Sequence, residues 1–275
     1  MTIDAHHHFW NYSAEEYGWL DDSMSCIRRN FLPNDLDQEI RRTGVDGVVS
    51  VQARTTIDET RWLLDLAGQN PFVRAVVGWV PLREERLPDE LESLCENPRL
   101  RALREVMQGQ PKGALLDKRF NEGVARLKDF GLAYDILIFD NQLAEAQVFV
   151  DRHPEQVFVL DHLAKPRIRD SVREPWASGI REIARRQNVF CKVSGMVTEA
   201  DVRAWNPDQL RPYFDIALEA FGPDRLMFGS DWPVCLPGVE YPRWLQIVRG
   251  WASELSAAEQ SELFGGSAIR AYKLK

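Results

Sequence analysis

Short apolar runs alternate with longer segments of helical periodicity along most of this chain. Eight runs are rich in β-branched or aromatic residues and are bounded by turn residues, as strands usually are. Most of them are apolar at successive positions, so we expect both of their faces to be buried, as in a parallel sheet covered by helices. These predicted strands are residues 3–6, 47–52, 74–80, 100–107, 133–138, 157–161, 189–193 and 225–228.

The segments between these runs carry apolar residues at helical spacing. In residues 58–68, for example, Trp62, Leu63 and Leu66 lie on one side of a predicted helix. Ser256 and Glu259 have the spacing of a capping box, which predicts the start of a last helix. Further helices are predicted at residues 120–130, 143–153 and 207–220, with an outer apolar helix across 244–255.

This alternation predicts the α/β class and one domain over residues 1–275, a (β/α)₈ or TIM barrel. The connections are long enough for right-handed crossovers, which favours a closed barrel. An open, doubly wound sheet is the alternative. Residues 11–31 fit neither element, and in a barrel they form the first loop over the carboxyl ends of the strands, where active sites lie.

Composition narrows the classes of partner. The formal net charge of −8 argues against a nucleic acid, although a local basic pocket for a small anion is compatible with it. No run approaches the roughly 20 apolar residues of a membrane span, and the N-terminus lacks a secretory signal. A cytoplasmic protein is therefore expected, with a small-molecule partner, no membrane, and reduced cysteines at positions 26, 95, 191 and 235. The helix across 244–255 packs either on the barrel or on a second subunit, so a homo-oligomer is one alternative.

The first predicted strand ends in a cluster of histidines, Asp4-Ala5-His6-His7-His8-Phe9-Trp10. His6 and His8 are two positions apart, so on a strand their side chains point to the same side. Two imidazoles at a barrel mouth can hold a divalent metal ion through one ring nitrogen each. Hydrogen-bonded polar residues, or a purification tag, are the alternatives at this point.

Two later strands also end in polar side chains. The sixth runs into Asp161-His162 and the eighth into Gly229-Ser230-Asp231. Strand eight neighbours strand one in a barrel, so Asp231 is expected beside the first histidines. Asp231 can take a proton from water, while His162 or a metal ion polarises a carbonyl. A helix N-cap is the alternative role for Asp231.

These motifs together resemble the amidohydrolase-related (amidohydrolase 2) family of the amidohydrolase superfamily, a branch that contains sugar-acid lactonases. The likeness extends over nearly the whole chain and includes Val51-Gln52-Ala53, Gly78-Trp79-Val80, Lys192-Val193-Ser194-Gly195 and Phe264-Gly265-Gly266-Ser267-Ala268. It implies a metal-dependent-hydrolase-like barrel that opens the ring of a sugar-acid lactone, such as L-fucono- or L-rhamnono-lactone, in sugar catabolism.

The resemblance also implies roles for individual residues. Asp231 is expected to be the base that activates water, and His162 to contact the scissile carbonyl. His6, His8 and Asp231 are expected to hold one divalent metal ion, zinc or manganese. The resemblance leaves open whether the reaction needs that ion.

Aromatic and hydrogen-bonding side chains near the strand ends suit a polyhydroxylated ring. The expected substrate-binding residues are Trp10, Gln52, Trp79, Arg104 and Trp232. The fourth strand departs from the family pattern because Glu105 follows Arg104, and alternation allows Glu105 to face either the mouth or the barrel wall.

Three other functions stay open. One is a metal-dependent decarboxylase of an aromatic acid. Another is a hydrolase of a pyrone- or muconolactone-type dicarboxylate lactone, which would need converging cations. The third is a catalytically silent barrel that binds a metabolite. The candidate cations near the mouth are Arg28, Arg29, Arg54, Arg104, Lys165 and Lys192.

Overall fold

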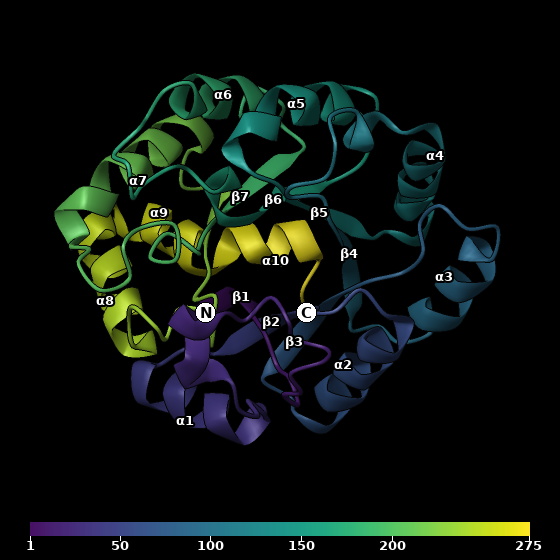
Figure 1. Ribbon diagram of the computed structural model, residues 1–275, viewed down its shortest axis with the longest axis horizontal. Coiled ribbons are helices and arrows are strands. Elements are labelled where there is room, and N and C mark those ends of the chain that lie inside the picture. Colours follow the sequence, from purple (N-terminus) through teal and green to yellow (C-terminus); the bar gives the residue numbers. More distant parts are fainter.

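Eight parallel strands form the centre of the computed structural model, which describes residues 1–275 (Figure 1). Each strand pairs with the next one in the chain, so the order in the sheet is the order in the sequence. The strands are β1 (Ile3–His7), β2 (Gly47–Val51), β3 (Val73–Gly78), β4 (Leu100–Val106), β5 (Ala133–Leu137), β6 (Phe158–Leu160), β7 (Val189–Val193) and β8 (Leu226–Phe228).

The sheet closes into a barrel where the chain leaving β8 meets β1. A parallel bridge joins His7 to Trp232. The amide of His8 donates to the carbonyl of Trp232 at 2.7 Å, and the amide of Asp231 donates to the carbonyl of His6 at 2.8 Å. The predicted barrel is therefore confirmed, and the open sheet is excluded.

Helices surround the barrel (Figure 1). Those predicted at residues 58–68, 143–153 and 207–220 are present with small shifts of their ends, and the helix predicted at 120–130 is α4 followed by a 3₁₀ turn. The helices are α1 (Pro33–Thr43), α2 (Ile57–Gln69), α3 (Leu87–Cys95), α4 (Lys118–Arg126), α5 (Leu143–Asp151), α6 (Trp176–Ile183), α7 (Pro207–Phe221), α8 (Tyr241–Trp251), α9 (Ala257–Ser261) and α10 (Ser267–Tyr272).

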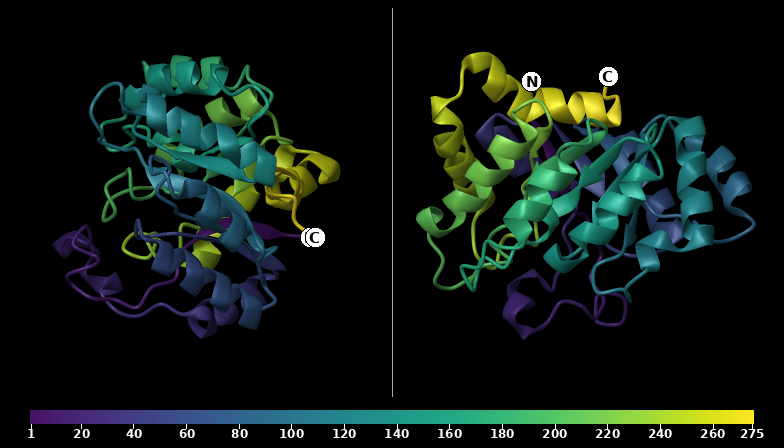
Figure 2. Two further views of the ribbon diagram at one scale, coloured as in Figure 1. Left: turned by 90° about the vertical axis from the view of Figure 1, so that its right-hand side faces the viewer. Right: turned by 90° about the horizontal axis from the view of Figure 1, so that it is seen from above.

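The two ends of the barrel are covered by different segments (Figure 2). The C-terminal helix α10 crosses one end, and its Ala271 and Tyr272 pack with residues of the barrel interior such as Val49 and Met227. Residues 11–31 lie at the opposite end, as predicted, and include a short 3₁₀ helix, Asp22–Ile27.

The apolar face of α8 packs within the chain. Trp244, Leu245, Val248 and Trp251 are all buried, which accounts for the apolar run there without a second subunit. No helix of the chain combines the length and the apolar character needed to cross a membrane.

Candidate active site

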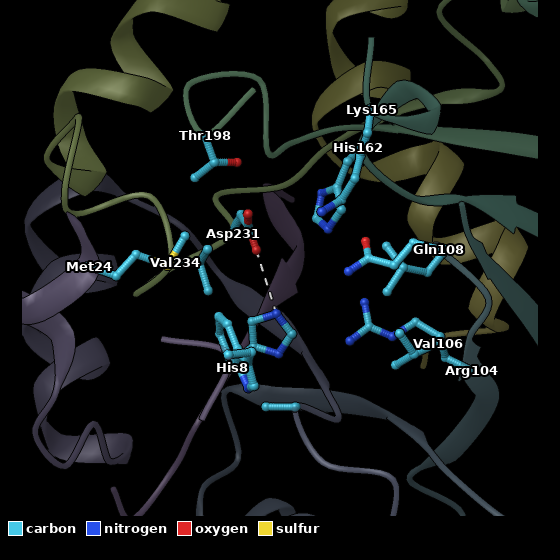
Figure 3. Close-up of a pocket in the computed structure, with 13 residues that line it drawn as sticks. His8, Met24, Arg104, Val106, Gln108, His162, Lys165, Thr198, Asp231 and Val234 are labelled. Atoms are coloured by element: carbon cyan, nitrogen blue, oxygen red, sulfur yellow. Dashed lines mark ion pairs between the residues drawn. The ribbon is translucent and has the colours of Figure 1, made fainter. Parts of the chain in front are cut away.

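A cavity of about 380 Å³ opens at the carboxyl ends of the strands, within the size range of small-molecule sites (Figure 3). One wall carries His8, His162 and Asp231, and the rest mixes polar with apolar side chains. The lining residues are His8, Trp19, Met24, Ala53, Arg104, Val106, Gln108, Leu137, His162, Lys165, Thr198, Asp231 and Val234.

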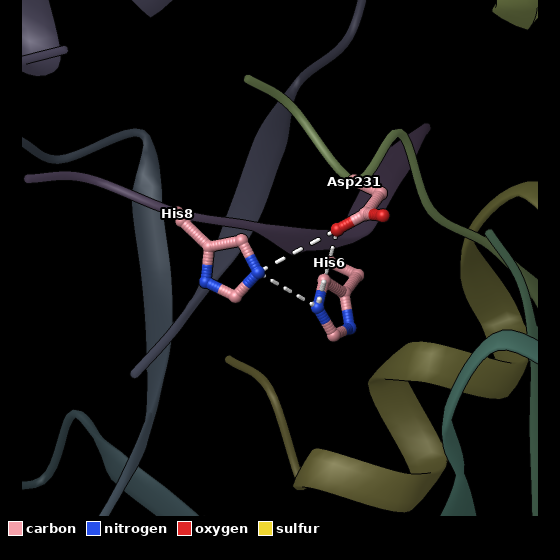
Figure 4. Close-up of side chains that lie close together, drawn as sticks. All are labelled: His6, His8 and Asp231. Carbon is pink, nitrogen blue, oxygen red and sulfur yellow. Dashed lines mark hydrogen bonds and ion pairs between the residues drawn. The ribbon is translucent and has the colours of Figure 1, made fainter. Parts of the chain in front are cut away.

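His6, His8 and Asp231 form a compact cluster at the seam between β1 and β8 (Figure 4). The Nε2 atoms of His6 and His8 are 3.2 Å apart. Asp231 Oδ1 lies 3.7 Å from His6 Nε2 and 3.5 Å from His8 Nε2. The sequence prediction that these three side chains converge is confirmed in position.

The local backbone explains why they converge. His6 and His8 alternate to one side of the extended chain, and the closing hydrogen bond from the Asp231 amide to the His6 carbonyl sets the carboxylate beside them. Asp231 has a left-handed backbone, with φ at 57°. Gly229 allows the close approach of the two segments, because a Cβ there would lie 2.9 Å from the Cβ of His6.

His162 reaches the same cavity from the turn after β6. Its Nδ1 is 2.8 Å from the hydroxyl oxygen of Ser194, which leaves Nε2 free for a ligand. Gly195 makes room for the ring, because a Cβ at that position would lie 2.7 Å from the His162 ring. Burial lowers the pKa of His162 to about 4, so the ring is neutral at pH 7.

Burial and neighbouring charges also set the protonation states of Asp231 and His6. Burial alone raises the pKa of Asp231, but His162 and His8 outweigh burial and leave that pKa below its usual value. Burial, followed by the charge of Lys192, lowers the pKa of His6 well below its usual value. At neutral pH the site therefore contains a carboxylate at Asp231 and neutral imidazoles at His6 and His162, as water activation or metal binding requires.

A buried ionic network lies beneath the cavity, inside the barrel. Lys192 Nζ is 2.6 Å from Asp135 Oδ2 and 2.9 Å from Asp161 Oδ1. Arg104 Nη1 donates to Asp161 Oδ2 at 2.8 Å, and the Tyr272 hydroxyl donates to Asp135. Lys192, Asp135 and Asp161 are completely buried. The network thus ties β4, β5, β7, the turn after β6 and α10 together directly below His6, whose Nδ1 is 3.1 Å from Lys192 Nζ.

The structure brings only some of the predicted substrate-binding residues into this cavity. Arg104 lines it, and Gln52 lies behind Arg104 and accepts hydrogen bonds from its guanidinium, one of them at 2.7 Å. Trp10, Trp79 and Trp232 do not line it.

Each of the three tryptophans has a packing role instead. The Trp10 indole donates to the carbonyl of Arg29, and its ring packs against Phe31. Trp232 also packs against Phe31. The Trp79 indole donates to Glu105 at 3.0 Å. The predicted strands placed these residues near strand ends. The alternation of side chains along a strand did not show that their rings turn away from the mouth.

The Trp79 contact also settles the direction of Glu105, which lies against the barrel wall with Arg83 nearby, 3.8 Å away. Of the candidate cations, only Arg104 and Lys165 line the cavity. Lys192 is buried below it. Arg54 pairs with Glu59 at 2.9 Å, and Arg28 pairs with Asp22 at 2.9 Å.

Several lining residues were missed by sequence reasoning. Trp19 and Met24 come from the first loop, and Thr198 from the loop after β7. The placement of residues 11–31 over the mouth was a usable signal for the first two. A charged residue in the middle of an apolar strand, as at Asp135 and Lys192, was the signal for the buried network.

Comparison with known proteins agrees with this geometry. A sequence profile of the family described as Amidohydrolase matches residues 3–274. The chain is 40% identical to an L-fucono-1,5-lactonase of Burkholderia multivorans, with 100% of this chain and 96% of that enzyme aligned. It is 36% identical to an L-fucono-1,5-lactonase of Burkholderia ambifaria over the same shares of the two chains.

A solved structure is also closely similar. It is an amidohydrolase from Burkholderia multivorans with bound zinc, which superposes with a TM-score of 0.96 at 40% identity, over 100% of both chains. The resemblance inferred from the strand-end motifs is thereby confirmed along the entire length. The chain belongs to the amidohydrolase family.

Proposed function

We propose that this protein hydrolyses the ring ester of a sugar-acid lactone, with L-fucono-1,5-lactone as the first substrate to test. The observation that carries the proposal is the 40% identity, along the whole chain, to an enzyme named L-fucono-1,5-lactonase. The cavity supports it, because a carboxylate and a neutral imidazole meet on one wall of a space sized for a small ring.

The chemistry follows from the protonation states of Asp231 and His162. The Asp231 carboxylate removes a proton from water, and the water oxygen attacks the lactone carbonyl carbon. The proposed tautomer of the neutral His162 ring has its proton on Nε2: Nδ1 then accepts from the Ser194 hydroxyl, 2.8 Å away, and Nε2–H donates a hydrogen bond to the carbonyl oxygen. The bond from the carbonyl carbon to the ring oxygen breaks, and that oxygen receives the proton held by Asp231.

The cluster of His6, His8 and Asp231 fits one divalent metal ion. Its three ligand atoms lie 3.2 to 3.7 Å from one another, the separations expected around a tetrahedral ion with bonds of about 2.0–2.2 Å. Two imidazoles and one carboxylate are also a ligand set typical of catalytic zinc. A bound ion would supply Lewis acidity next to the carbonyl.

The dicarboxylate-lactone alternative is less well supported by the charges of the cavity. Arg104 already binds Asp161 and Gln52. Lys165 already pairs with Glu199, 3.4 Å away. The charge of each lining cation is therefore already matched by a carboxylate of the protein, which favours a neutral polyhydroxylated ring over a dicarboxylate.

A lactone panel tests the proposed function. The purified protein is expected to accelerate ring opening of L-fucono- and related sugar-acid 1,5- and 1,4-lactones over their spontaneous rates, measured with a pH indicator and by NMR of the product. The same preparation should release no carbon dioxide from 2,6-dihydroxybenzoate. Carbon dioxide release without lactone turnover would instead support the decarboxylase alternative.

Metal binding gives a second prediction, at His6 and His8. After treatment with a chelator, the protein is expected to bind about one zinc ion per chain by calorimetry, as a catalytic-type site with three protein ligands does. His6→Ala and His8→Ala should each weaken zinc binding strongly. Losing a residue that only hydrogen-bonds a metal ligand typically costs about 10–100-fold in affinity, and losing a ligand itself should cost more. His153→Ala, which removes a histidine outside the cavity, is the matched control. Unchanged affinity in both cluster variants would place the ion elsewhere.

A further inference from the structure

The turn that carries His162 has an unusual backbone. Four consecutive non-glycine residues, His162 to Lys165, have φ between 50° and 56°. A left-handed backbone is disfavoured for an L-residue, because Cβ comes too close to the following carbonyl oxygen. One hydrogen bond closes the turn, from the Lys165 amide to the His162 carbonyl at 2.8 Å, and one anchors it from outside, from the Trp176 indole to the Leu163 carbonyl at 2.6 Å.

This turn places Lys165 beside the catalytic wall. In a turn with three residues per repeat, residues three positions apart lie on the same side. His162 and Lys165 are three apart, and both line the cavity (Figure 3). Strain concentrated at such a position is typical of functional sites.

Lys165 has a partner of opposite charge in the loop after β7. Its Nζ lies 3.4 Å from Glu199 Oε1, and the two side chains are 19% and 22% exposed. Thr198, the neighbour of Glu199, lines the cavity as well. A partly solvated ion pair contributes little to stability, so folding alone does not explain why a strained turn holds this one at the mouth.

The other side chains of the cavity indicate which part of a bound ring would lie near the Lys165–Glu199 pair. Met24, Val106, Leu137 and Val234 present apolar surface to the cavity. Outside the catalytic wall the polar lining side chains are Lys165, Thr198, Gln108 and Arg104, and the guanidinium of Arg104 is already bonded to Asp161 and Gln52. A ring with its carbonyl at His162 and Asp231 therefore has Lys165, Thr198 and Gln108 as partners for its hydroxyl groups.

We propose that the Lys165–Glu199 pair recognises the hydroxyl groups of the lactone ring and thereby determines which lactones react; this rests on the proposed function. A hydroxyl group both donates and accepts a hydrogen bond. The ammonium of Lys165, which lines the cavity, can donate to the hydroxyl oxygen, whereas Glu199 lies outside the lining and holds that ammonium through the ion pair at 3.4 Å. A ring without hydroxyls leaves the ammonium without this contact.

The experiment compares two lactones in several variants. The ratio of kcat/KM for a hydroxylated sugar-acid lactone to that for unsubstituted δ-valerolactone is measured in the wild type, Lys165→Met, Glu199→Gln and the double variant. In each single variant we expect this ratio to fall about 10- to 100-fold, as expected for loss of a hydrogen bond to a charged group. The fall in the ratio should come from a lower kcat/KM for the hydroxylated lactone, while kcat/KM for δ-valerolactone should change by less than about threefold.

Two further variants separate recognition from folding. Lys165→Arg, which keeps the positive charge, should retain more of the ratio than Lys165→Met. Lys118→Met removes an exposed lysine of α4 and should leave both rates unchanged. The double variant should lose less than the product of the two single losses, because Glu199 acts on the hydroxyl groups through Lys165.

The contrary outcomes are distinct. Equal losses of kcat/KM on both lactones would assign Lys165 to the chemical step or to folding, and an unchanged kcat/KM on both would remove its role in selection. Either result overturns this inference and leaves the proposed function standing. If the wild type hydrolyses no lactone, the proposed function fails and takes this inference with it.

Discussion

Asp231→Asn is expected to lower kcat for a sugar-acid lactone by about 10²- to 10⁴-fold, the usual contribution of a positioned base. The carboxylate is buried at the cavity wall, and its pKa lies below the usual value, so it is ionised and able to accept a proton at neutral pH. Asparagine keeps the shape of the side chain and removes that ability. The rate is measured with saturating lactone, so that a change in KM does not obscure kcat.

Asp231 is also a candidate metal ligand, so the same variant needs a second readout. Metal content is measured beside the rate, and the wild type is assayed after treatment with a chelator. If the chelated wild type keeps its activity while Asp231→Asn loses it, the carboxylate acts as the base. Asp129→Asn, an exposed position near the amino end of β5, is the matched control. Full activity in Asp231→Asn would show that the site assignment is wrong although the family is right.

Lys192→Met is expected to lower the free energy of unfolding by about 3–5 kcal/mol, because removing one partner of a buried ion pair leaves an uncompensated charge. Lys192 is completely buried between Asp135 and Asp161. Methionine fills a similar volume but pairs with neither carboxylate. Urea denaturation followed by fluorescence measures the change.

A double variant tests whether charge, rather than packing, causes the loss. Asp161 keeps Arg104 as a partner, and adding Asp135→Asn removes the carboxylate that is left without a cation, so Lys192→Met/Asp135→Asn should be more stable than Lys192→Met alone. Lys118→Met should change stability by less than about 0.5 kcal/mol. A loss below about 1 kcal/mol in Lys192→Met would show that the network contributes little net stability, as some buried ion pairs do.

The sequence by itself determined the barrel and the centre of the candidate site. Eight short apolar runs alternate with helical segments, and a chain of this pattern buries its strands most completely as a closed parallel barrel. The position of His6, His8 and Asp231 followed from two simple rules: alternation along a strand, and the contact between the first and last strands of a barrel. Local pattern and global topology agree at these residues, so they were predictable.

Tertiary structure alone decided where other polar residues point. The strands of a parallel barrel are apolar on both faces, so alternation does not distinguish the interior from the helix side. Lys192 was a candidate for the mouth and instead lies below it, while Glu105 turned to the barrel wall. Trp10, Trp79 and Trp232 found hydrogen-bond and ring partners outside the cavity, because packing decides the direction of a large ring.

The pairing of Lys165 with Glu199 also depended on the three-dimensional fold. It requires a left-handed turn in a segment without glycine, a backbone that local sequence preferences argue against. It also requires two loops that are 34 positions apart in the chain to meet at one side of the mouth. Contacts made by the surrounding chain, including the Trp176 indole on the Leu163 carbonyl, hold that backbone in place. Contacts between residues so far apart in the chain form only in the folded protein. The sequence pattern therefore did not reveal the pairing of Lys165 with Glu199.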